Sequence, residues 1–381
     1  MAALALARAG VDVVMLDRAA FPREKTCGDG LMPDAMAALA RVGLADAVLA
    51  GSLRLRVLRI YAPDGTAVHV NGEFAVLPRE QLDAALCDAA VAAGARLLAP
   101  VHVSGPIEQG GAVTGVSGRD AGGEALDLAA KVTVLATGAG AGPLKAFRVC
   151  ERSEPSANAA RFYVTIDRPT ALDGALHISY QRGICPGYGW IFPGPGGRFN
   201  VGVGFFSDAR PAIVNLRALM ARFLEVFPLA RDLMARGGLA SAIKGAPLRT
   251  GLAGAVLARP GLLVAGEAAG LTYPISGEGI GKAMESGLLA ADVIAEGLRA
   301  GRGPSEIAAR YAAALSSTLA GRFRAYARAQ RWVAHPRLVD FLARRANAGT
   351  YVRRQLEGLV NETVEPGAIL SVSGILRSLF Q

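Results

Sequence analysis

The sequence lacks a long uninterrupted apolar run, although 52% of its 381 residues are apolar. A membrane-spanning helix needs roughly 20 consecutive apolar residues, and no run approaches that length. We therefore predict a soluble protein, long enough for two or three packed layers and two intertwined domains. A secretory signal is not expected at the start, because no basic segment precedes the first apolar run and Arg8 and Asp12 interrupt it.

Cysteine is scarce as well. The four cysteines, Cys27, Cys87, Cys150 and Cys185, lie far apart and form no C-x-x-C pair. This spacing indicates neither a zinc site nor a disulfide framework, and we predict no metal. Free cysteines favour a reducing compartment, so we expect the protein to be cytoplasmic.

Acidic residues are fewer than basic ones, which gives a formal net charge of +9. Such an excess suits an anionic membrane surface or acidic ligands such as pyrophosphates, and it also arises from a GC-rich coding sequence. Residues 322–354 are basic but lack the interleaved aromatics of a nucleic-acid module, so no nucleic acid is expected. We interpret their arginines as a solvated face; contact with a pyrophosphate, or peripheral attachment to the inner face of the membrane, is the alternative. These arginines include Arg337, Arg344, Arg345, Arg353 and Arg354.

The most informative stretch is Gly266–Gly287, which follows the apolar run Gly261–Ala265. It predicts a strand, a glycine-rich turn and a helix, with Gly277 and Gly279 flanking Glu278 where the helix begins. The free N–H groups at a helix start suit a phosphate or the N1/O2 edge of a reduced flavin. An ordinary strand–loop–helix connection is the alternative.

This stretch resembles the second flavin-binding motif of the FAD-dependent oxidoreductases with the p-hydroxybenzoate-hydroxylase-like fold. In that motif a strand ends in G-D-A-A-G and is followed by P-x-x-G-E-G-I and a helix. Glu267 stands here in place of the usual Asp, which hydrogen-bonds the ribityl chain of the flavin in the family. The resemblance implies that FAD is bound by Gly266, Glu267, Pro274, Gly277, Glu278, Gly279 and Ile280.

The beginning of the chain predicts the second half of a βαβ unit. Ala2–Ala9 has helical composition, and Val11–Leu16 reads as a buried strand that ends at Asp17 and Arg18. In a dinucleotide-binding unit, the acidic residue that holds the ribose lies about 20 residues after the phosphate-binding glycines. Counting back from Asp17 passes Met1, so we expect these residues to lack the first strand and the G-x-G-x-x-G turn. A late start assignment or a truncation would explain this. Two unpaired strand edges would then make the 381-residue form poorly stable or weak in FAD binding.

A second irregular stretch, Phe21–Pro33, reads FPREKTCGDGLMP. It resembles the F-P-R-x-K-x-C-G-x-G loop of the geranylgeranyl reductase family, which lies along the flavin. The resemblance implies that Arg23, Lys25 and Gly28 flank the cofactor and that Cys27 reaches the flavin and the substrate cavity. A solvated loop with an incidental cysteine is the alternative.

Gln81–Ala93 reads as a helix, and Arg79 precedes it. The family resemblance implies that Arg79 contacts FAD phosphate or adenosine; a surface charge is the alternative. Three segments that alternate or run apolar predict a small β-meander: Arg96–His102, Gly111–Arg119 and Ala125–Ala136. The following Thr137 and Gly138 resemble the A-T-G turn that passes near the adenine end of FAD.

Alternating strands follow. They are Arg161–Asp167, Ala175–Arg182, Gly189–Pro193 and Arg198–Phe206. The string from Tyr188 to Pro193, with Gly202 and Gly204 after it, resembles the Y-x-W-x-F-P…G-x-G pattern of geranylgeranyl reductases. A period of two places Tyr188, Trp190 and Phe192 on one face, and with Gly202 and Gly204 opposite we expect a slot for a long apolar chain. A packed sheet core is the alternative.

Together these patterns predict an α/β (α+β) protein: a Rossmann-like FAD-binding domain with an inserted antiparallel β-sheet substrate domain and C-terminal helices. The FAD-binding domain would comprise residues 1–150, incomplete at its N-terminus, and 246–300. The substrate domain would comprise residues 151–245, and a helical region, residues 301–381, would cover the cavity.

The combined resemblance is to geranylgeranyl reductases, which implies reduction of isolated C=C bonds in an isoprenoid chain by FAD. The electrons would come from NADPH or a ferredoxin, although no nicotinamide fingerprint is visible. An acid must protonate the second carbon. We favour Cys27 or a water beside it, with Tyr188, Tyr273 and Glu278 as the other candidates. There are three alternatives: a flavin-dependent monooxygenase, a flavin-dependent halogenase and a truncated remnant that binds little FAD. The pattern of the halogenases is W-x-W-x-I-P. The oligomeric state stays open.

Overall fold

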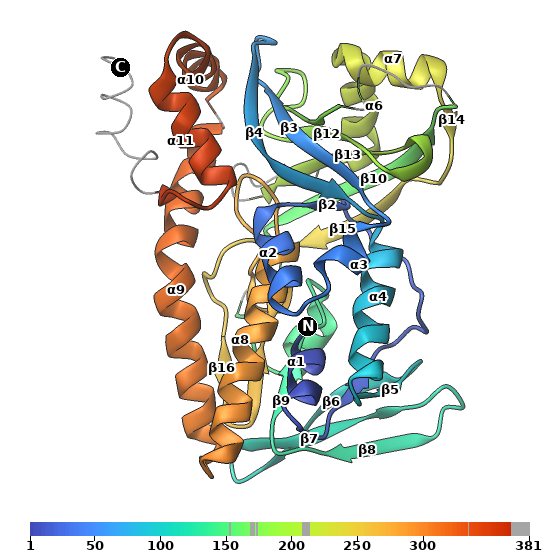
Figure 1. Cartoon of the computed structure of the whole chain (residues 1–381), viewed down its shortest axis with the longest axis vertical. Coiled ribbons are helices and arrows are strands. Elements are labelled where there is room, and N and C mark those ends of the chain that lie inside the picture. Colours follow the sequence, from blue (N-terminus) through green and yellow to red (C-terminus); the bar gives the residue numbers. More distant parts are fainter. Residues whose placement is uncertain (152–153, 168–171, 173, 208–213, 334, 367–381) are drawn as a thin grey trace.

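The computed structural model describes residues 1–151, 154–167, 172, 174–207, 214–333 and 335–366 (Figure 1). A large sheet occupies one end of the molecule and a small antiparallel sheet the other, with parallel strands and helices between them. The mixture of helices and sheets is the α/β class that the sequence predicts.

The parallel strands are divided between two sheets. β1 (Val14–Leu16) pairs with β5 (Arg96–Leu98), and β9 (Thr133–Leu135) pairs with β17 (Leu262–Val264), beside which β16 (Ala258–Arg259) runs antiparallel. Within the residues that the structure describes, no strand joins these two sheets.

Helices surround these strands. Their bounds are α1 (Ala2–Arg8), α2 (Pro33–Arg41), α3 (Ala45–Leu49), α4 (Arg79–Ala92), α5 (Ala141–Ala146) and α8 (Ile280–Arg299). α1 packs against α4 and α8, and α2 also packs on α8. α8 is amphipathic and buries a stripe of small and aliphatic side chains against the strands, which fixes the position of its first turn.

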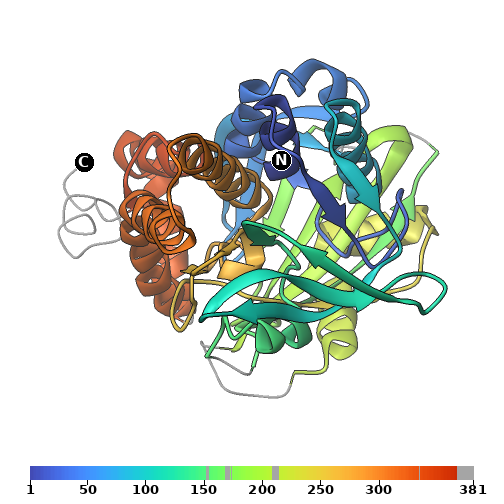
Figure 2. The same cartoon turned by 90° about the horizontal axis from the view of Figure 1, so that it is seen from below.

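The small sheet contains the second predicted strand of the meander and the first part of the third, Ala125–Ala136, whose last residues form β9 beside β17 instead. It consists of β6 (His102–Gln109), β7 (Ala112–Arg119) and β8 (Ala125–Ala129), and Figure 2 shows it lying across the end of the molecule. The prediction that Arg96–His102 opens the meander was wrong, because Arg96–Leu98 returns from α4 and pairs parallel with β1. Gly105 and Pro106, with two register shifts, obscure the apolar alternation of β6.

The large sheet has nine strands, in the order β14-β10-β13-β12-β11-β3-β4-β2 with β15 also beside β10. Their bounds are β2 (Gly30–Leu31), β3 (Leu53–Tyr61), β4 (Ala67–Val76), β10 (Ala157–Thr165), β11 (Leu176–Ser179), β12 (Tyr188–Pro193), β13 (Arg198–Phe206), β14 (Gly238–Leu239) and β15 (Lys244–Leu248). β10, β13, β12 and β11 are antiparallel, as predicted. The hairpin of β3 and β4, which joins this sheet by a parallel pairing with β11, was not predicted.

One face of this sheet, which we call the outer face, packs on α6 (Leu216–Val226) and α7 (Pro228–Arg236). There Phe223 lies over Gly189, where a Cβ atom would come within 2.4 Å of the ring. The opposite, inner face carries Tyr188, Trp190 and Phe192, which belong to the same hydrophobic cluster as Ala343, Ala346 and Val352 of the C-terminal helices. Because successive residues of a strand point to opposite faces, every second residue of β10, β12 and β13 lies on the inner face.

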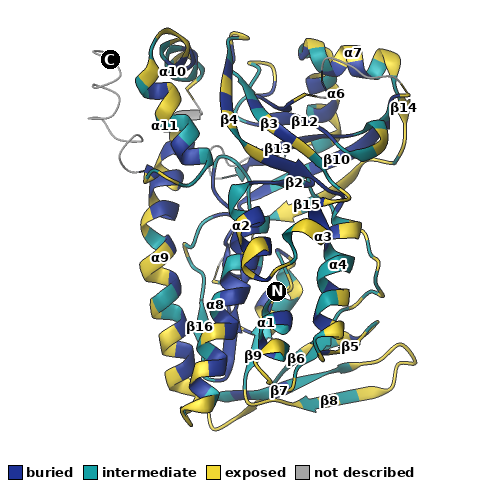
Figure 3. Ribbon diagram, in the orientation of Figure 1, coloured by how far each residue is buried: buried dark blue, intermediate teal, exposed yellow. Residues whose placement is uncertain are grey.

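The C-terminal helices run along one side of both regions. α9 (Pro304–Val333) packs along α8, and α10 (Pro336–Ala348) and α11 (Thr350–Val360) reach β4. In Figure 3 the buried residues of α9 form a stripe on the side of α8. Among the described residues, no helix combines the length and the apolarity that a bilayer crossing requires.

Candidate functional site

The three motifs singled out in the sequence meet on the inner face of the large sheet. A Cβ atom at Gly28 would lie 3.3 Å from Phe192 Cε2 and 3.4 Å from Trp190 Nε1. At Gly277, whose φ is +72°, a Cβ atom would lie 2.5 Å from Tyr188 Oη. The Cys27 loop (Phe21–Pro33) and the turn before α8 therefore pack on neighbouring parts of one aromatic strand.

That strand presents Tyr188, Trp190 and Phe192 on one face, as its period of two predicts. All three side chains are buried, and the ring centroids of successive residues are 5.7 and 6.5 Å apart. Gly202 and Gly204 pair with Trp190 and Tyr188 across β13, and Cβ atoms there would lie 2.0 and 2.6 Å from those rings. The two glycines thus make room for the rings within the sheet; a slot for an apolar chain stays a prediction.

Cys27 lies among cationic groups. Arg79 begins α4, lies beside the Cys27 thiol and makes a two-point ion pair with Asp83, with N···O distances of 2.8 and 2.9 Å. Lys25 Nζ lies 4.0 Å from Glu267 Oε2. The positive charge of Arg79, followed by burial, lowers the pKa of Lys25. Because its surroundings disfavour the charged form of Lys25, a bound anion nearby would stabilise that form.

The residues near Lys25 fit a dinucleotide. At Gly138, with φ of +74°, a Cβ atom would lie 3.8 Å from Glu267 Oε2 and 4.0 Å from Lys25 Nζ. The left-handed backbone at this turn favours glycine and leaves the chain open to close approach. Lys25 and Arg79 supply positive charge for a pyrophosphate, and Glu267 supplies an acceptor for ribityl or ribose hydroxyls. The donor set therefore suits FAD.

The turn before α8 is tightly built. Gly266, with φ of +61°, begins the short helix η3 (Gly266–Ala269) and donates its N–H to Ser286 Oγ at 2.9 Å. Gly279 caps α8 ahead of Ile280, and a Cβ atom at Gly279 would lie 2.6 Å from Thr272 Oγ1. Pro274 of the same turn is buried. The glycines thus allow the first turn of a 20-residue helix to approach the inner face.

Glu278 stands between these glycines in a desolvated position. Burial raises its pKa to about 8, and the negative charges of Asp34 and Glu362 act in the same direction. Its carbonyl oxygen accepts a hydrogen bond from the N–H of Tyr273 at 2.7 Å. The raised pKa favours the protonated form of Glu278 at neutral pH, which is the property that its candidacy as the acid requires.

The remaining predicted cofactor residues lie near the end of β1 or at the A-T-G turn. Arg23 joins Asp17 and Asp83, with N···O distances of 2.9 and 3.0 Å. Arg18 and Thr137 are exposed. The structure thus brings Arg23 onto the same Asp83 that Arg79 contacts, while binding of FAD by all of these residues stays a prediction.

A buried polar network that the sequence analysis missed fixes the Cys27 loop to the sheet. Asp29 adopts φ of +65°, and its carboxylate accepts hydrogen bonds from Tyr163 Oη at 2.6 Å and Asn200 Nδ2 at 2.8 Å. Asn200 also donates to the carbonyl oxygen of Cys27 at 2.8 Å and accepts from Trp190 Nε1 at 2.9 Å. One asparagine therefore sets the relative positions of Cys27 and Trp190.

The sequence carried a signal for this network. Asp29 occupies the variable position of the C-G-x-G string, and Asn200 lies two residues before Gly202 on the same face of β13. Polar residues in phase with an apolar face are candidates for buried hydrogen bonding.

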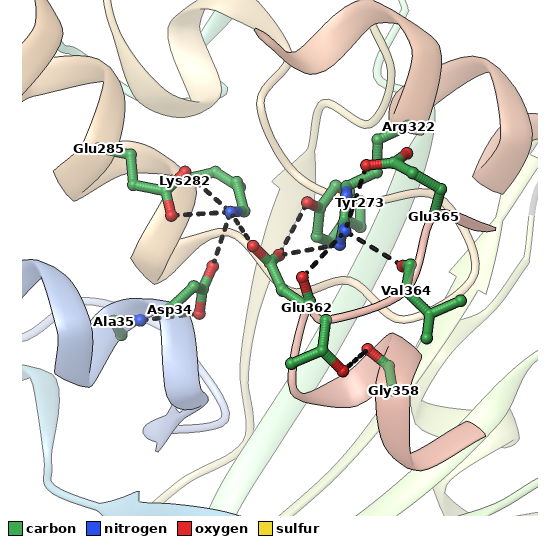
Figure 4. Close-up of polar contacts among 11 residues, drawn as sticks. Asp34, Ala35, Tyr273, Lys282, Glu285, Arg322, Gly358, Glu362, Val364 and Glu365 are labelled. Carbon is green, nitrogen blue, oxygen red and sulfur yellow. Dashed lines mark hydrogen bonds and ion pairs between the residues drawn. The ribbon is translucent and has the colours of Figure 1, made fainter. Parts of the chain in front are cut away.

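A second buried cluster lies beside α8 (Figure 4). Lys282, only 1% exposed, places its ammonium 3.3 Å from Asp34, 2.7 Å from Glu285 and 2.8 Å from Glu362. Tyr273 Oη donates to Glu362 at 2.9 Å. The lysine supplies the cation that these three carboxylates require, and the cluster joins α2 and α8 to the segment after α11.

Comparison with known proteins places this arrangement in a family. Residues 28–293 match the family model of the FAD dependent oxidoreductases. A menaquinone reductase of Mycobacterium tuberculosis (strain CDC 1551) is 34% identical over 319 residues, which cover 80% of this chain and 76% of that protein. A digeranylgeranylglycerophospholipid reductase of Methanocella arvoryzae is 29% identical over 337 residues, 84% of this chain and 80% of that protein.

Solved structures show the same fold. A geranylgeranyl bacteriochlorophyll reductase-like protein of Thermoplasma acidophilum superimposes with a TM-score of 0.79 at 21% identity, covering 100% of this chain and 92% of the other. Flavin-dependent brominases and halogenases share the fold too. The chain belongs to the FAD-dependent oxidoreductases, in the group that resembles the geranylgeranyl reductases.

Proposed function

We propose that this enzyme uses FAD to reduce C=C bonds in the prenyl chain of a lipid. The convergence of the Cys27 loop, the aromatic strand and the turn before α8 carries the proposal. It is supported by relatives named as reductases of menaquinone and of a digeranylgeranyl phospholipid. The electrons would come from NADPH or a ferredoxin, and the lipid would be reached by peripheral attachment to the inner face of the membrane.

Bound FAD would supply the hydride. The residues for it are Lys25, Arg79, Glu267 and Gly138 around the phosphates and ribityl chain, and the turn from Gly277 to Ile280 at the ring. An isolated alkene offers no charge for the protein to stabilise, so the protein must orient the chain, exclude water and hold a proton. Trp190 and Phe192 provide a dry aromatic surface for the chain.

The proton would come from a group beside the aromatic strand. Cys27 is our first candidate, and Tyr188 lies near it at the edge of Gly277. Glu278, whose raised pKa favours the protonated form at neutral pH, is the third. Burial raises the pKa of Tyr188, which makes this phenol a weaker acid than Glu278.

Oxygenation and halogenation are the rival reactions of this fold. Tyr188 and Phe192 depart from the W-x-W-x-I-P pattern of halogenases, which favours reduction. The test is anaerobic incubation of the purified chain with FAD, dithionite and prenyl substrates, followed by mass spectrometry. A gain of two hydrogens per reduced bond is expected; products that gain oxygen in air, or halogen, would overturn the proposal. Flavin absorbance of the purified chain separates both results from a protein that binds little FAD.

A further inference from the structure

Arg161 is a buried cation on the inner face of the large sheet, in the same row as Trp190. Its partner across the strands is Gly202, and Gly202 in turn pairs with Trp190. The indole lies over Gly202, on the strand between the two residues. Arg161 is 1% exposed, so its guanidinium stands within the protein beside the proposed path of the prenyl chain.

The hydrogen-bonding capacity of Arg161 is only partly used. Nη2 donates to Glu24 Oε1 at 2.7 Å, and the guanidinium carbon lies 4.4 Å from the centre of the Tyr163 ring. The buried Nε and Nη1 atoms have no hydrogen-bond partner. Buried donors are nearly always paired in proteins, and an unpaired buried guanidinium edge therefore points to a ligand.

The surrounding charges do not use this edge. Glu24, whose side chain is 38% exposed, also pairs with Lys244, so it has a cation without Arg161. Arg198 also lies over the Tyr163 ring, with its guanidinium carbon 3.7 Å from the ring centre. The carboxylate of Asp29 is occupied by Tyr163 and Asn200. Arg161 and Lys244 thus share the carboxylate of Glu24, and no carboxylate pairs with Nε or Nη1 of Arg161.

We propose that Arg161 binds an oxygen of the polar headgroup to which the prenyl chain is attached. This inference rests on the proposed function and specifies its substrate: a prenyl lipid with a carbonyl or phosphate oxygen near the start of the chain. A guanidinium presents parallel N–H donors that suit either oxygen. With the headgroup at Arg161, the first isoprene units contact Trp190 and later ones extend toward Tyr188.

The test compares Arg161→Gln with two variants that act on the same ion pair. Lys244→Gln removes the other cation from Glu24, and Glu24→Gln removes the carboxylate itself. Binding to the full chain is measured by tryptophan fluorescence with three probes: geranylgeranyl diphosphate, a menaquinone, and a prenyl hydrocarbon without oxygen. We expect Arg161→Gln to weaken one or both oxygen-bearing probes about tenfold, to leave the hydrocarbon unchanged, and to differ from both controls.

The outcomes separate the two headgroups and the two proposals. If Arg161→Gln loses affinity only for geranylgeranyl diphosphate, the headgroup carries a phosphate. If it loses affinity only for the menaquinone, the headgroup is a quinone. Equal weakening of the hydrocarbon, the same effect in Glu24→Gln, or loss of flavin absorbance in Arg161→Gln would overturn the role of Arg161. In those cases prenyl reduction by the wild type would still stand; if the wild type binds none of the probes, both proposals fail.

Arg161→Lys serves if the glutamine variant does not fold. It keeps the charge but not the forked donors, so the same selective loss of affinity is expected, in smaller degree. A lysine variant with wild-type affinity for every probe would count against the proposal, provided that its circular dichroism matches the wild type.

Discussion

Glu278 couples the protonation of a single residue to the stability of the protein. Its folded-state pKa of about 8 lies above its ordinary value of 4.5, so the folded protein keeps a proton that the unfolded chain loses earlier as the pH rises. The free energy of unfolding should therefore decrease between about pH 4.5 and pH 8. Asp34 and Glu285, whose pKa values burial also raises, add to the same slope.

Glu278→Gln tests this directly. The variant cannot titrate, so its free energy of unfolding should fall less steeply with pH, by up to about 1.4 kcal/mol per pH unit in that window. Urea unfolding at a series of pH values measures the slope. Identical slopes in both proteins would show that Glu278 is not held protonated. Exposed Glu225→Gln is the control and should leave the slope unchanged.

Cys27 is the residue whose removal should separate catalysis from cofactor binding. If Cys27 delivers the proton, Cys27→Ala should lower the rate of prenyl reduction by a factor on the order of 10²–10⁴ while flavin absorbance stays normal. Anaerobic turnover measured by mass spectrometry gives the rate. Cys87→Ala, a buried cysteine of α4, is the matched control. A Cys27→Ala enzyme with wild-type turnover would transfer the role to Glu278 or Tyr188.

At the scale of elements, Asn200 of β13 links the Cys27 loop to the large sheet. Asn200→Ala removes three buried hydrogen bonds. They join the Asn200 side chain to the Trp190 N–H, to the Cys27 carbonyl oxygen and to the Asp29 carboxylate. Each unpaired group costs about 1–3 kcal/mol, so we expect the free energy of unfolding to fall by at least about 2 kcal/mol. Asn71→Ala, an exposed residue of β4 that binds Glu357, should cost under about 1 kcal/mol.

Both values come from urea unfolding of the two variants. A loss in Asn200→Ala no larger than that in Asn71→Ala would mean that the network contributes little to the position of the loop.

The elements that the sequence predicted well are those with a strong local signal. α8 follows a run of apolar residues and two glycines, and β12 to β13 alternate around a Gly-Pro-Gly-Gly turn. β5 was placed in the wrong sheet, because three residues have the same alternation whether they pair with a meander or with β1. The partner of a strand is decided by tertiary packing, which its own sequence does not contain.

The same limit applies to the site. Residues in recognisable strings, such as Cys27, Trp190 and Gly277, could be predicted to lie together. Arg161, Asn200 and Lys282 were missed, because a buried polar residue is identified by its distant partners. The partners of Lys282 show this, since Asp34 and Glu362 lie about 250 and 80 residues away along the chain.

At the scale of the whole molecule, Lys282 connects regions that are far apart in the sequence. Its carboxylate partners come from α2, α8 and the segment after α11, and Arg322 of α9 donates to the carbonyl oxygens of Glu362 and Val364 in that segment. The cluster therefore joins α9 and the segment after α11 to α2 and α8 (Figure 4).

Lys282→Met keeps the apolar stem of the side chain and removes the charge. Breaking a buried ion pair leaves uncompensated charges, so the free energy of unfolding should fall by about 3–5 kcal/mol, compared with under about 0.5 kcal/mol for exposed Lys145→Met. The loss should be larger at pH 8 than at pH 5. Without the lysine, the carboxylates relieve their mutual repulsion by binding protons, which happens more readily at pH 5. Adding Glu362→Gln to Lys282→Met should recover part of the loss, since it removes one of these charges. If the three carboxylates tolerate Lys282→Met with no such cost at pH 8, the ion pairs of Lys282 contribute little to the position of the C-terminal helices.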